Sequence, residues 1–330
     1  MKALSIVRPG LAQIADMAEP QAGAGEVLVD IAYVGYCGSD LTSYRGLNPL
    51  VSYPRVPGHE IAGTIAALGE GVESFAIGQP VTVLPYFNCG TCKACRSGKP
   101  NACPNNQTMG VQREGAMTKR VAVPAEKIIA VDGLPIRDLA LVEPCAVGFH
   151  AVRRAELAAG ETVVVLGCGM IGLGVLLGAL RAGARVIAVD LSDGKLEVAR
   201  KLGAHETVNA SGDVKAAVAA LTGEAVGAEA TFLQAVDIVA TGGRVVYIGY
   251  AKAPIAYDTK FFITKELDIR GSRNALRGDF DDVVDALRAN PGAGDLIVSR
   301  VVDVDEAPQA LADWHENPGA FTKVLVWFGT

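Results

Sequence analysis

The pattern of apolar positions changes its character near residue 161. Up to that point, short apolar runs such as residues 3–7 and 27–34 alternate with turns rich in Gly, Pro and Glu, which is typical of a β-rich domain. Residues 162–166 then form a nearly continuous β-branched run, as expected of a parallel strand that is buried on both faces. The chain is therefore expected to combine a β-rich part with an α/β part.

The second part alternates strands with helices. Further strands are predicted over residues 185–190, 206–209, 244–250 and 266–274, and helices over residues 173–182, 195–202, 214–221 and 228–240. The tail adds a helix over residues 279–289, a strand near 296–302, a helix over 306–314 and a closing strand over 323–328. A doubly wound sheet should have another buried strand before residue 228, but residues 222–228 contain no apolar run of that kind. Either that strand is reduced to almost nothing, or several residues are missing from this sequence.

Length and composition limit the classes of function. The 330 residues suffice for two domains, and a hydrophobic fraction of 50% with 38 glycines is typical of an α/β enzyme. The net charge of −6 and the aromatic fraction of 6% provide no attraction to nucleic acid or to anionic membranes. The most apolar stretch, residues 162–180, is interrupted by five glycines, which fits a buried strand, turn and helix better than a membrane span. Residues 1–10 contain no evident signal peptide, so a cytoplasmic protein is expected.

Four of the seven cysteines lie within one short segment: Cys89, Cys92, Cys95 and Cys103. Thiolates at such spacings on a turn can converge on one tetrahedral zinc ion. Disulfides are the alternative explanation, but nothing else in the sequence indicates an oxidising compartment. A bridge between Cys89 and Cys92, or between Cys92 and Cys95, would also close a very tight loop. The segment therefore predicts a closed, structural zinc site.

A dinucleotide-binding fingerprint follows the strand at residues 162–166. Residues 167–172 read Gly-Cys-Gly-Met-Ile-Gly, a helix is predicted directly after them, and the next strand ends on Asp190. Glycines at these positions let the backbone approach a pyrophosphate at the helix N-terminus. Asp190 would accept a hydrogen bond from the ribose 2′-hydroxyl and repel a 2′-phosphate, which favours NAD over NADP. The residues assigned to the cofactor are Gly167, Gly169, Met170, Ile171, Gly172 and Asp190.

Three other features carry less information when each is taken alone. Cys37 is followed closely by Ser39, and a buried cysteine in a turn is the simpler explanation for it. His59 stands beside Glu60 at the start of a strand, which is commonly just a polar pair. Glu143 lies in a strongly apolar segment, where a carboxylate needs a metal, a charged partner or a helix cap. We favour the metal or the charged partner, because Glu is a poor cap.

Taken together, these motifs resemble the zinc-dependent medium-chain dehydrogenases. The segments Cys37-Gly-Ser-Asp and Gly58-His-Glu, the four-cysteine segment, Glu143-Pro and residues 167–172 occur in the order of that family and span most of the chain. Within the polyol and sugar-acid branch, Tyr44-Arg-Gly-Leu-Asn-Pro and Tyr53-Pro-Arg-Val are most similar to the hexonate dehydrogenases.

The resemblance implies an α/β protein of two domains. Residues 1–145 and 274–330 would form a GroES-like, β-rich catalytic domain that holds a catalytic and a structural zinc ion. Residues 146–273 would form a Rossmann domain, with a doubly wound parallel sheet, that binds NAD. The resemblance also implies a homodimer or a homotetramer.

The same resemblance implies the roles of the weaker features. Cys37, His59 and Glu60 would bind the catalytic zinc, with Glu143 as a fourth ligand or an exchangeable neighbour. Bound zinc would lower the pKa of a substrate hydroxyl, whose carbon then gives its hydride to the nicotinamide. Ser39 occupies the position that contacts the reacting oxygen and begins the proton relay, with a turn serine as the alternative reading.

One position departs from the pattern of the family. Thr42 stands where sorbitol-type enzymes usually carry a histidine, so protons are expected to leave by the ribose hydroxyls and water. Arg273 and Asn274 fall where polyol enzymes place an arginine near substrate and cofactor, and Arg45 is a further candidate. A guanidinium could grip a substrate carboxylate with two hydrogen bonds or bond vicinal hydroxyls. A surface salt bridge is the alternative role for Arg273.

The predicted function is therefore the NAD-dependent oxidation of a secondary alcohol on a polyol or sugar acid. L-threonine or a simple secondary alcohol is the alternative substrate. A zinc protein that senses NAD without catalysis is the alternative from another class.

Overall fold

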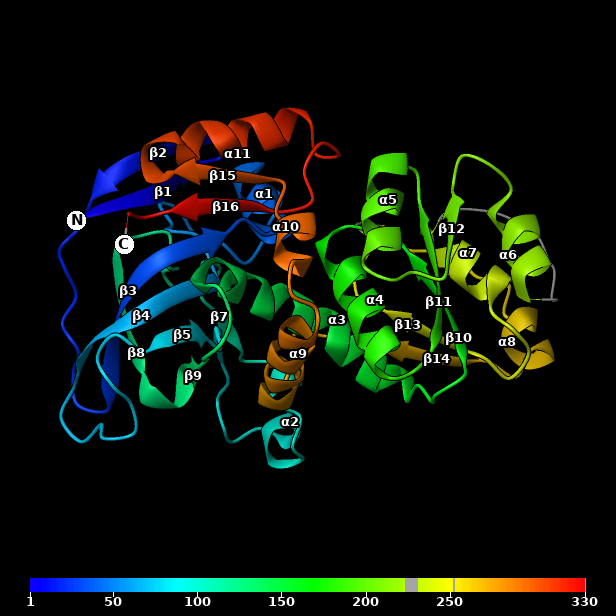
Figure 1. Cartoon of the computed structure of the whole chain (residues 1–330), viewed down its shortest axis with the longest axis horizontal. Helices are drawn as coiled ribbons and strands as arrows, with labels where there is room; N and C mark the ends of the chain where they lie inside the picture. Colours follow the sequence, from blue (N-terminus) through cyan, green and yellow to red (C-terminus); the bar gives the residue numbers. More distant parts are fainter. Residues whose placement is uncertain (223–230, 252, 330) are drawn as a thin grey trace. The chain divides into compact units, whose positions relative to one another are not determined.

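The computed structural model of the protein describes residues 1–222, 231–251 and 253–329 and divides the chain into two units (Figure 1). Unit 1 consists of residues 1–144 and 276–330, and unit 2 consists of residues 145–275. The domain boundaries predicted from the sequence follow residue 145 and residue 273, within two residues of these limits. Unit 2 is thus inserted in sequence between the two parts of unit 1.

Most strands of the chain belong to unit 1. They are β1 (Lys2–Arg8), β2 (Leu11–Asp16), β3 (Glu26–Gly35), β4 (Glu60–Leu68), β5 (Pro80–Val83), β6 (Tyr86–Phe87), β7 (Gln107–Thr108), β8 (Arg120–Pro124), β9 (Ile128–Ala130), β15 (Arg300–Asp303) and β16 (Val324–Trp327). The helices of this unit are α1 (Gly38–Tyr44), α2 (Lys93–Arg96), α9 (Arg277–Ala289), α10 (Ala293–Ile297) and α11 (Ala307–Glu316). Helix α3 (Val142–Ala155) begins in unit 1 and continues into unit 2.

Strand β3 is the centre of the largest sheet in unit 1. The sheet runs in the order β15-β16-β3-β4-β5-β9, and β8 also pairs with β3. Because β3 pairs antiparallel with both β4 and β16, a strand from the tail lies beside one from the N-terminal part (Figure 1). Alternate residues of β3, namely Val27, Val29 and Ile31, are fully buried, since side chains at this spacing point to the same face. The predicted β-rich unit therefore includes the tail.

Unit 2 contains two parallel sheets among the described residues. The first is ordered β10-β11-β12 and the second pairs β13 with β14. Their bounds are β10 (Thr162–Leu166), β11 (Arg185–Asp190), β12 (Glu206–Asn209), β13 (Arg244–Tyr247) and β14 (Asp268–Gly271). The helices are α4 (Met170–Arg181), α5 (Asp193–Lys201), α6 (Val214–Thr222), α7 (Thr231–Ile238) and α8 (Lys260–Thr264). The missing strand noted at residues 222–228, and the first residues of the helix predicted over 228–240, lie outside the described residues.

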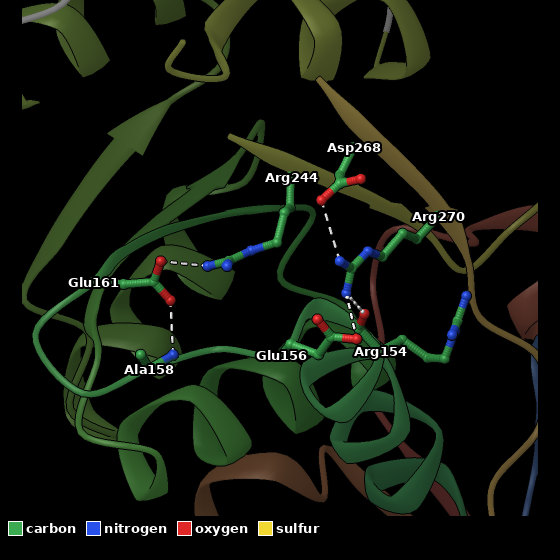
Figure 2. Close-up of polar contacts among 7 residues, drawn as sticks. All are labelled: Arg154, Glu156, Ala158, Glu161, Arg244, Asp268 and Arg270. Carbon is green, nitrogen blue, oxygen red and sulfur yellow. Dashed lines mark hydrogen bonds and ion pairs between the residues drawn. The ribbon is translucent and has the colours of Figure 1, made fainter. Parts of the chain in front are cut away.

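Polar contacts connect the β13–β14 sheet to the residue before β10 and to the end of α3 (Figure 2). Glu161, which directly precedes β10, accepts a hydrogen bond from Arg244 at the start of β13. Arg270 of β14 donates to the main-chain oxygen of Arg154 at 2.8 Å and pairs with Glu156 at 3.0 Å. Since these ion pairs are partly exposed, each contributes about 1 kcal/mol or less.

One predicted strand is partly wrong. The segment near residues 296–302 was expected to be a strand throughout, but α10 extends to Ile297 and β15 begins only at Arg300. Gly292 has a φ of 92°, which turns the chain sharply before α10. Ala293 and Ile297 are both buried, and their spacing of four residues fits one face of a helix. No helix in the described part of the chain is both long and apolar enough to cross a membrane.

Helices α3 and α4 approach each other so closely that glycine is required between them. A Cβ atom at Gly148 in α3 would lie 2.4 Å from the main-chain nitrogen of Val175 in α4. We therefore expect Gly148→Ala to push the helices apart and to lower the free energy of unfolding by about 1–3 kcal/mol. Urea denaturation followed by circular dichroism would measure this.

Gly194→Ala is the matched control, because Gly194 also lies within a helix, α5, but has open space around it. A Cβ atom added there would meet only Ser192 Oγ, at 3.7 Å. Replacement of an unhindered helical glycine by alanine should stabilise unit 2 by about 0.5–1 kcal/mol. Equal effects of the two substitutions would contradict the close contact of α3 and α4.

Candidate functional site

Cys37 lies between the end of β3 and the start of α1. It is the N-cap residue of α1, and its main-chain N–H donates to Asp40 Oδ2 at 2.9 Å. Ser39 is in the first turn of the same helix, and its buried Oγ has no hydrogen-bond partner among the described residues. This short helix therefore presents a thiol and a buried hydroxyl, two residues apart.

His59 and Glu60 stand at the start of β4, on the strand that pairs with β3. The register places Glu60 opposite Gly35, the last residue of β3. Gly58 has a φ of +99°, and a Cβ atom there would lie 2.8 Å from Val34 Cγ1, so the turn into β4 requires glycine. Pairing of β3 with β4 thus brings the segment with Cys37 next to the segment with His59.

The three predicted ligands of the catalytic zinc form one cluster. The ligand atoms of Cys37, His59 and Glu60 all lie within 4.8 Å of one another. His59 and Glu60 are 5% and 1% exposed, which limits the access of water to the cluster. One thiol, one imidazole and one carboxylate are a donor set that suits zinc and leaves it an open position.

The surroundings of His59 are strongly anionic. Burial disfavours the charged imidazolium, but the negative charges of Cys37, Glu143 and Asp40 outweigh it and raise the pKa of His59 well above its ordinary value. His59 Nδ1 is buried without a hydrogen-bond partner in the described part of the chain. Neighbours that favour a proton on this ring also favour a metal cation beside it, so the residues fit a divalent ion.

Glu143 lies close to the cluster but has a partner of its own. It is in the first turn of α3, which begins at Val142, so the alternative that Glu143 forms a helix cap is wrong. Its side chain is buried, and Oε1 accepts a hydrogen bond from the hydroxyl of Tyr86. Tyr86 was not predicted as a site residue, because it stands 57 positions away in sequence. Whether Glu143 binds the metal stays a prediction.

A buried lysine from the tail is the second residue that sequence reasoning missed. Lys323 Nζ donates to Glu60 Oε1 at 2.7 Å and to Oε2 at 2.6 Å, and also to the main-chain oxygen of Tyr36 at 2.9 Å. The side chains of Lys323 and Glu60 are 2% and 1% exposed. Burial raises the pKa of Glu60 to about 7, while the ammonium of Lys323 acts in the opposite direction. The cluster therefore contains a cation that already binds one of its carboxylates.

The four-cysteine segment converges as predicted. Cys92 Sγ lies 3.5 Å from Cys95 Sγ and 3.8 Å from Cys103 Sγ, and Cys103 Sγ lies 3.5 Å from Cys89 Sγ. Four sulfurs bound to zinc at about 2.3 Å would be about 3.8 Å apart, whereas disulfide sulfurs are about 2.05 Å apart. All four thiols are free, and main-chain N–H groups of Cys89 and Cys95 donate to sulfur. The segment fits a closed zinc site.

The dinucleotide fingerprint forms the turn between β10 and α4. Gly167 has a φ of 96°, and a Cβ atom at Gly172 would lie 1.8 Å from the main-chain oxygen of Gly167. Cβ atoms added at Gly167 and Gly169 would meet nothing within 4 Å, so this face of the turn is open to a ligand. Asp190 Oδ2 accepts from the N–H of Cys168 at 2.7 Å, which fixes its carboxylate beside the turn. Met170 and Ile171 form the first turn of α4, whose free N–H groups favour an anion.

The predicted substrate residues lie on different elements. Arg45 follows α1, and its guanidinium donates to Nδ1 and to the main-chain oxygen of His315, both at 2.8 Å. Arg273 and Asn274 follow β14 in unit 2, where Arg273 is exposed. Thr42 Oγ1 donates to the main-chain oxygen of Gly38 at 2.8 Å. The roles of Arg45, Arg273 and Asn274 stay predictions.

Comparison with known proteins shows the family of the chain. Residues 23–133 match the alcohol dehydrogenase GroES-like domain, and residues 171–289 match the zinc-binding dehydrogenase domain. L-galactonate-5-dehydrogenase of Escherichia coli is 38% identical over 273 residues, 80% of each chain. Sorbitol dehydrogenase of Bacillus subtilis is 34% identical over 268 residues, 76% of each chain.

Among solved structures, galactitol-1-phosphate dehydrogenase from Escherichia coli has a TM-score of 0.91 at 27% identity, over 99% of this chain and 100% of that one. The match thus covers both units of the chain, with a GroES-like domain and a Rossmann-type domain, as predicted. The chain belongs to the family of zinc-binding alcohol dehydrogenases, in its polyol and sugar-acid branch.

Proposed function

We propose that this protein oxidises a secondary alcohol of a polyol or sugar acid, such as a hexonate, with NAD as the hydride acceptor. The observation that carries the proposal is the cluster of Cys37 with the buried His59 and Glu60, a donor set that suits a catalytic rather than a structural zinc site. Relatives named for galactonate, sorbitol and galactitol 1-phosphate support a polyhydroxylated substrate.

The clustered residues would bind the metal, and the neighbouring Ser39 would transfer a proton. Zinc, when bound, supplies Lewis acidity that lowers the pKa of the substrate hydroxyl. Cys37, His59 and Glu60 would hold the ion, with Glu143 as a neighbour that can approach it. Ser39 would orient the hydroxyl and begin the proton relay, passing its own hydroxyl hydrogen onward as it accepts the substrate's, which its unpartnered, buried Oγ supports. Because Thr42 already donates to a main-chain oxygen, we propose that protons leave through the ribose hydroxyls and water.

The cofactor assignment rests on Asp190. Its carboxylate, fixed at the end of β11 by the N–H groups of Cys168 and Ser192, suits a ribose 2′-hydroxyl and would repel a 2′-phosphate. We assign NAD to the turn formed by residues 167–172. We further propose that the protein works in the cytoplasm as a homodimer or homotetramer, that Arg273, Asn274 and Arg45 contact the substrate, and that each chain holds two zinc ions.

Formation of NADH on a panel of substrates tests the function directly. We expect turnover on hexonates or polyols, and a decrease of about 10³-fold or more in Cys37→Ser, because loss of the Lewis acid raises the barrier by several kcal/mol. The panel should include L-threonine and 2-butanol. A preference for L-threonine or for 2-butanol would identify the protein as a threonine dehydrogenase or as a dehydrogenase of simple secondary alcohols, respectively. Absence of turnover on every alcohol, with zinc and NAD bound, would favour an NAD-sensing protein.

Exchange of Asp190 tests the cofactor. Asp190→Ser removes the charge that opposes a 2′-phosphate, so the ratio of kcat/KM for NAD to that for NADP should fall by about tenfold or more, equivalent to about 1.4 kcal/mol. Asp193→Ser is the control, because Asp193 is three residues further along and contacts Asn209. A wild-type preference for NADP would refute the role given to Asp190.

Substitution of Cys95 tests whether the four-cysteine site is structural and the Cys37 site catalytic. Cys95→Ser should release one zinc per chain and lower the melting temperature, because the four-cysteine segment loses its cross-link. Zinc at Cys37 and His59 should remain, so that folded enzyme still turns over. Loss of turnover with unchanged melting temperature and unchanged zinc content would contradict a structural role for this segment.

A further inference from the structure

The ammonium of Lys323 lies between the two segments that carry the clustered ligands. It donates to the main-chain oxygen of Tyr36, the residue before Cys37, and to both carboxylate oxygens of Glu60, the residue after His59. Lys323 directly precedes β16, so this group comes from the far end of unit 1 in sequence. A single buried cation therefore contacts both ligand segments.

Further contacts leave these segments little freedom. The N–H of Tyr36 donates to the main-chain oxygen of Val324 at 3.0 Å, so both main-chain polar groups of this residue are bound by residues 323 and 324. The carboxylate of Glu60 lies against Gly35, where an added Cβ would be 2.0 Å from Glu60 Oε2. The carboxylate of Glu60 is thus held between Gly35 of β3 and the ammonium of Lys323.

We propose that Lys323 is a positioning residue that sets the distance between the Cys37 and His59 ligands and restrains Glu60 beside the metal. This inference rests on the proposed function, because it assumes that these residues bind a catalytic zinc. Partners that orient metal ligands typically change metal affinity by about 10–100-fold when they are removed. A lysine that served only to stabilise the sheet would affect stability but not the geometry of the ligands.

The main variant is Lys323→Met, which keeps an unbranched side chain, one heavy atom shorter, and removes the charge. Zinc affinity of the Cys37 site should decrease by about 10–100-fold in a competition titration with a chelator, while the four-cysteine site keeps its zinc. In protein loaded with Co²⁺, the visible absorption bands of the site with a single thiolate should shift or broaden. Unchanged affinity together with unchanged bands in folded Lys323→Met would overturn the inference.

Lys2→Met is the matched control. Lys2 also pairs with a carboxylate at 2.6 Å, that of Asp305, but the two side chains are 53% and 58% exposed. It lies in the same unit and contacts none of the clustered ligands. Its metal affinity and cobalt spectrum should equal those of the wild type. An effect as large as that of Lys323→Met would mean that any lost ion pair disturbs the site, which would overturn the specific role of Lys323.

Lys323→Met leaves Glu60 buried without a counter-ion and could therefore prevent folding. A second comparison avoids this problem: the single variant Glu60→Gln is compared with the double variant Glu60→Gln/Lys323→Met, in which position 60 carries no charge. The double variant should still bind Co²⁺ more weakly than Glu60→Gln alone, since the contact with Tyr36 is lost. Equal affinities would overturn the inference. If the wild type binds only one zinc per chain, the proposed function itself is refuted. If the wild type binds two and the Lys323 variant binds them equally well, only the role of Lys323 is refuted.

Discussion

Antiparallel pairing of β3 with β4 is the interaction on which the site in unit 1 depends. The register places Gly35 opposite Glu60, so the residues that follow β3 lie beside those that open β4. A slip of one residue would move every side chain of β4 to the other face of the sheet and would separate His59 from Cys37. The same pairing provides the apolar core of unit 1, since β3 and β4 contribute several of its fully buried residues. The stability of the sheet and the relative positions of Cys37, His59 and Glu60 therefore depend on the same strand pairing.

Charge balance is the second constraint on the site. Cys37, Asp40, Glu60 and Glu143 lie close to His59, and each contributes a negative charge when it is deprotonated. Lys323 supplies one positive charge, and Tyr86 binds Glu143 through a neutral hydroxyl. The carboxylates of Glu60 and Glu143 thus differ in kind, because one is paired with a cation and the other with a dipole. A divalent cation would offset negative charge that Lys323 alone does not balance, which agrees with membership in a zinc-binding family.

The parts of the site that could be predicted from the sequence are those built by neighbours in the chain. The spacing of Cys89, Cys92 and Cys95 and the glycines of residues 167–172 are local patterns that few structures satisfy, so they predicted how these segments fold. Tyr86 and Lys323 follow no such pattern, because their partners stand 57 and 263 positions away. Only the folded sheet brings them together. Similarly, the turn at Gly292 that produced α10 depends on a positive φ, which the apolar pattern does not report.

The position of Lys323 in the chain has a consequence for how the protein is made. Cys37, His59 and Glu60 are synthesised early, but the ammonium that neutralises Glu60 comes only after all of unit 2. Domains generally fold as units during synthesis, beginning from the N-terminal side. Unit 2 can satisfy this order, because residues 145–275 are continuous. Unit 1 is discontinuous in sequence, so Glu60 is synthesised before the lysine that pairs with it in the folded chain. We therefore expect the cluster of Cys37, His59 and Glu60 to reach its final geometry only after all of unit 2 has been synthesised.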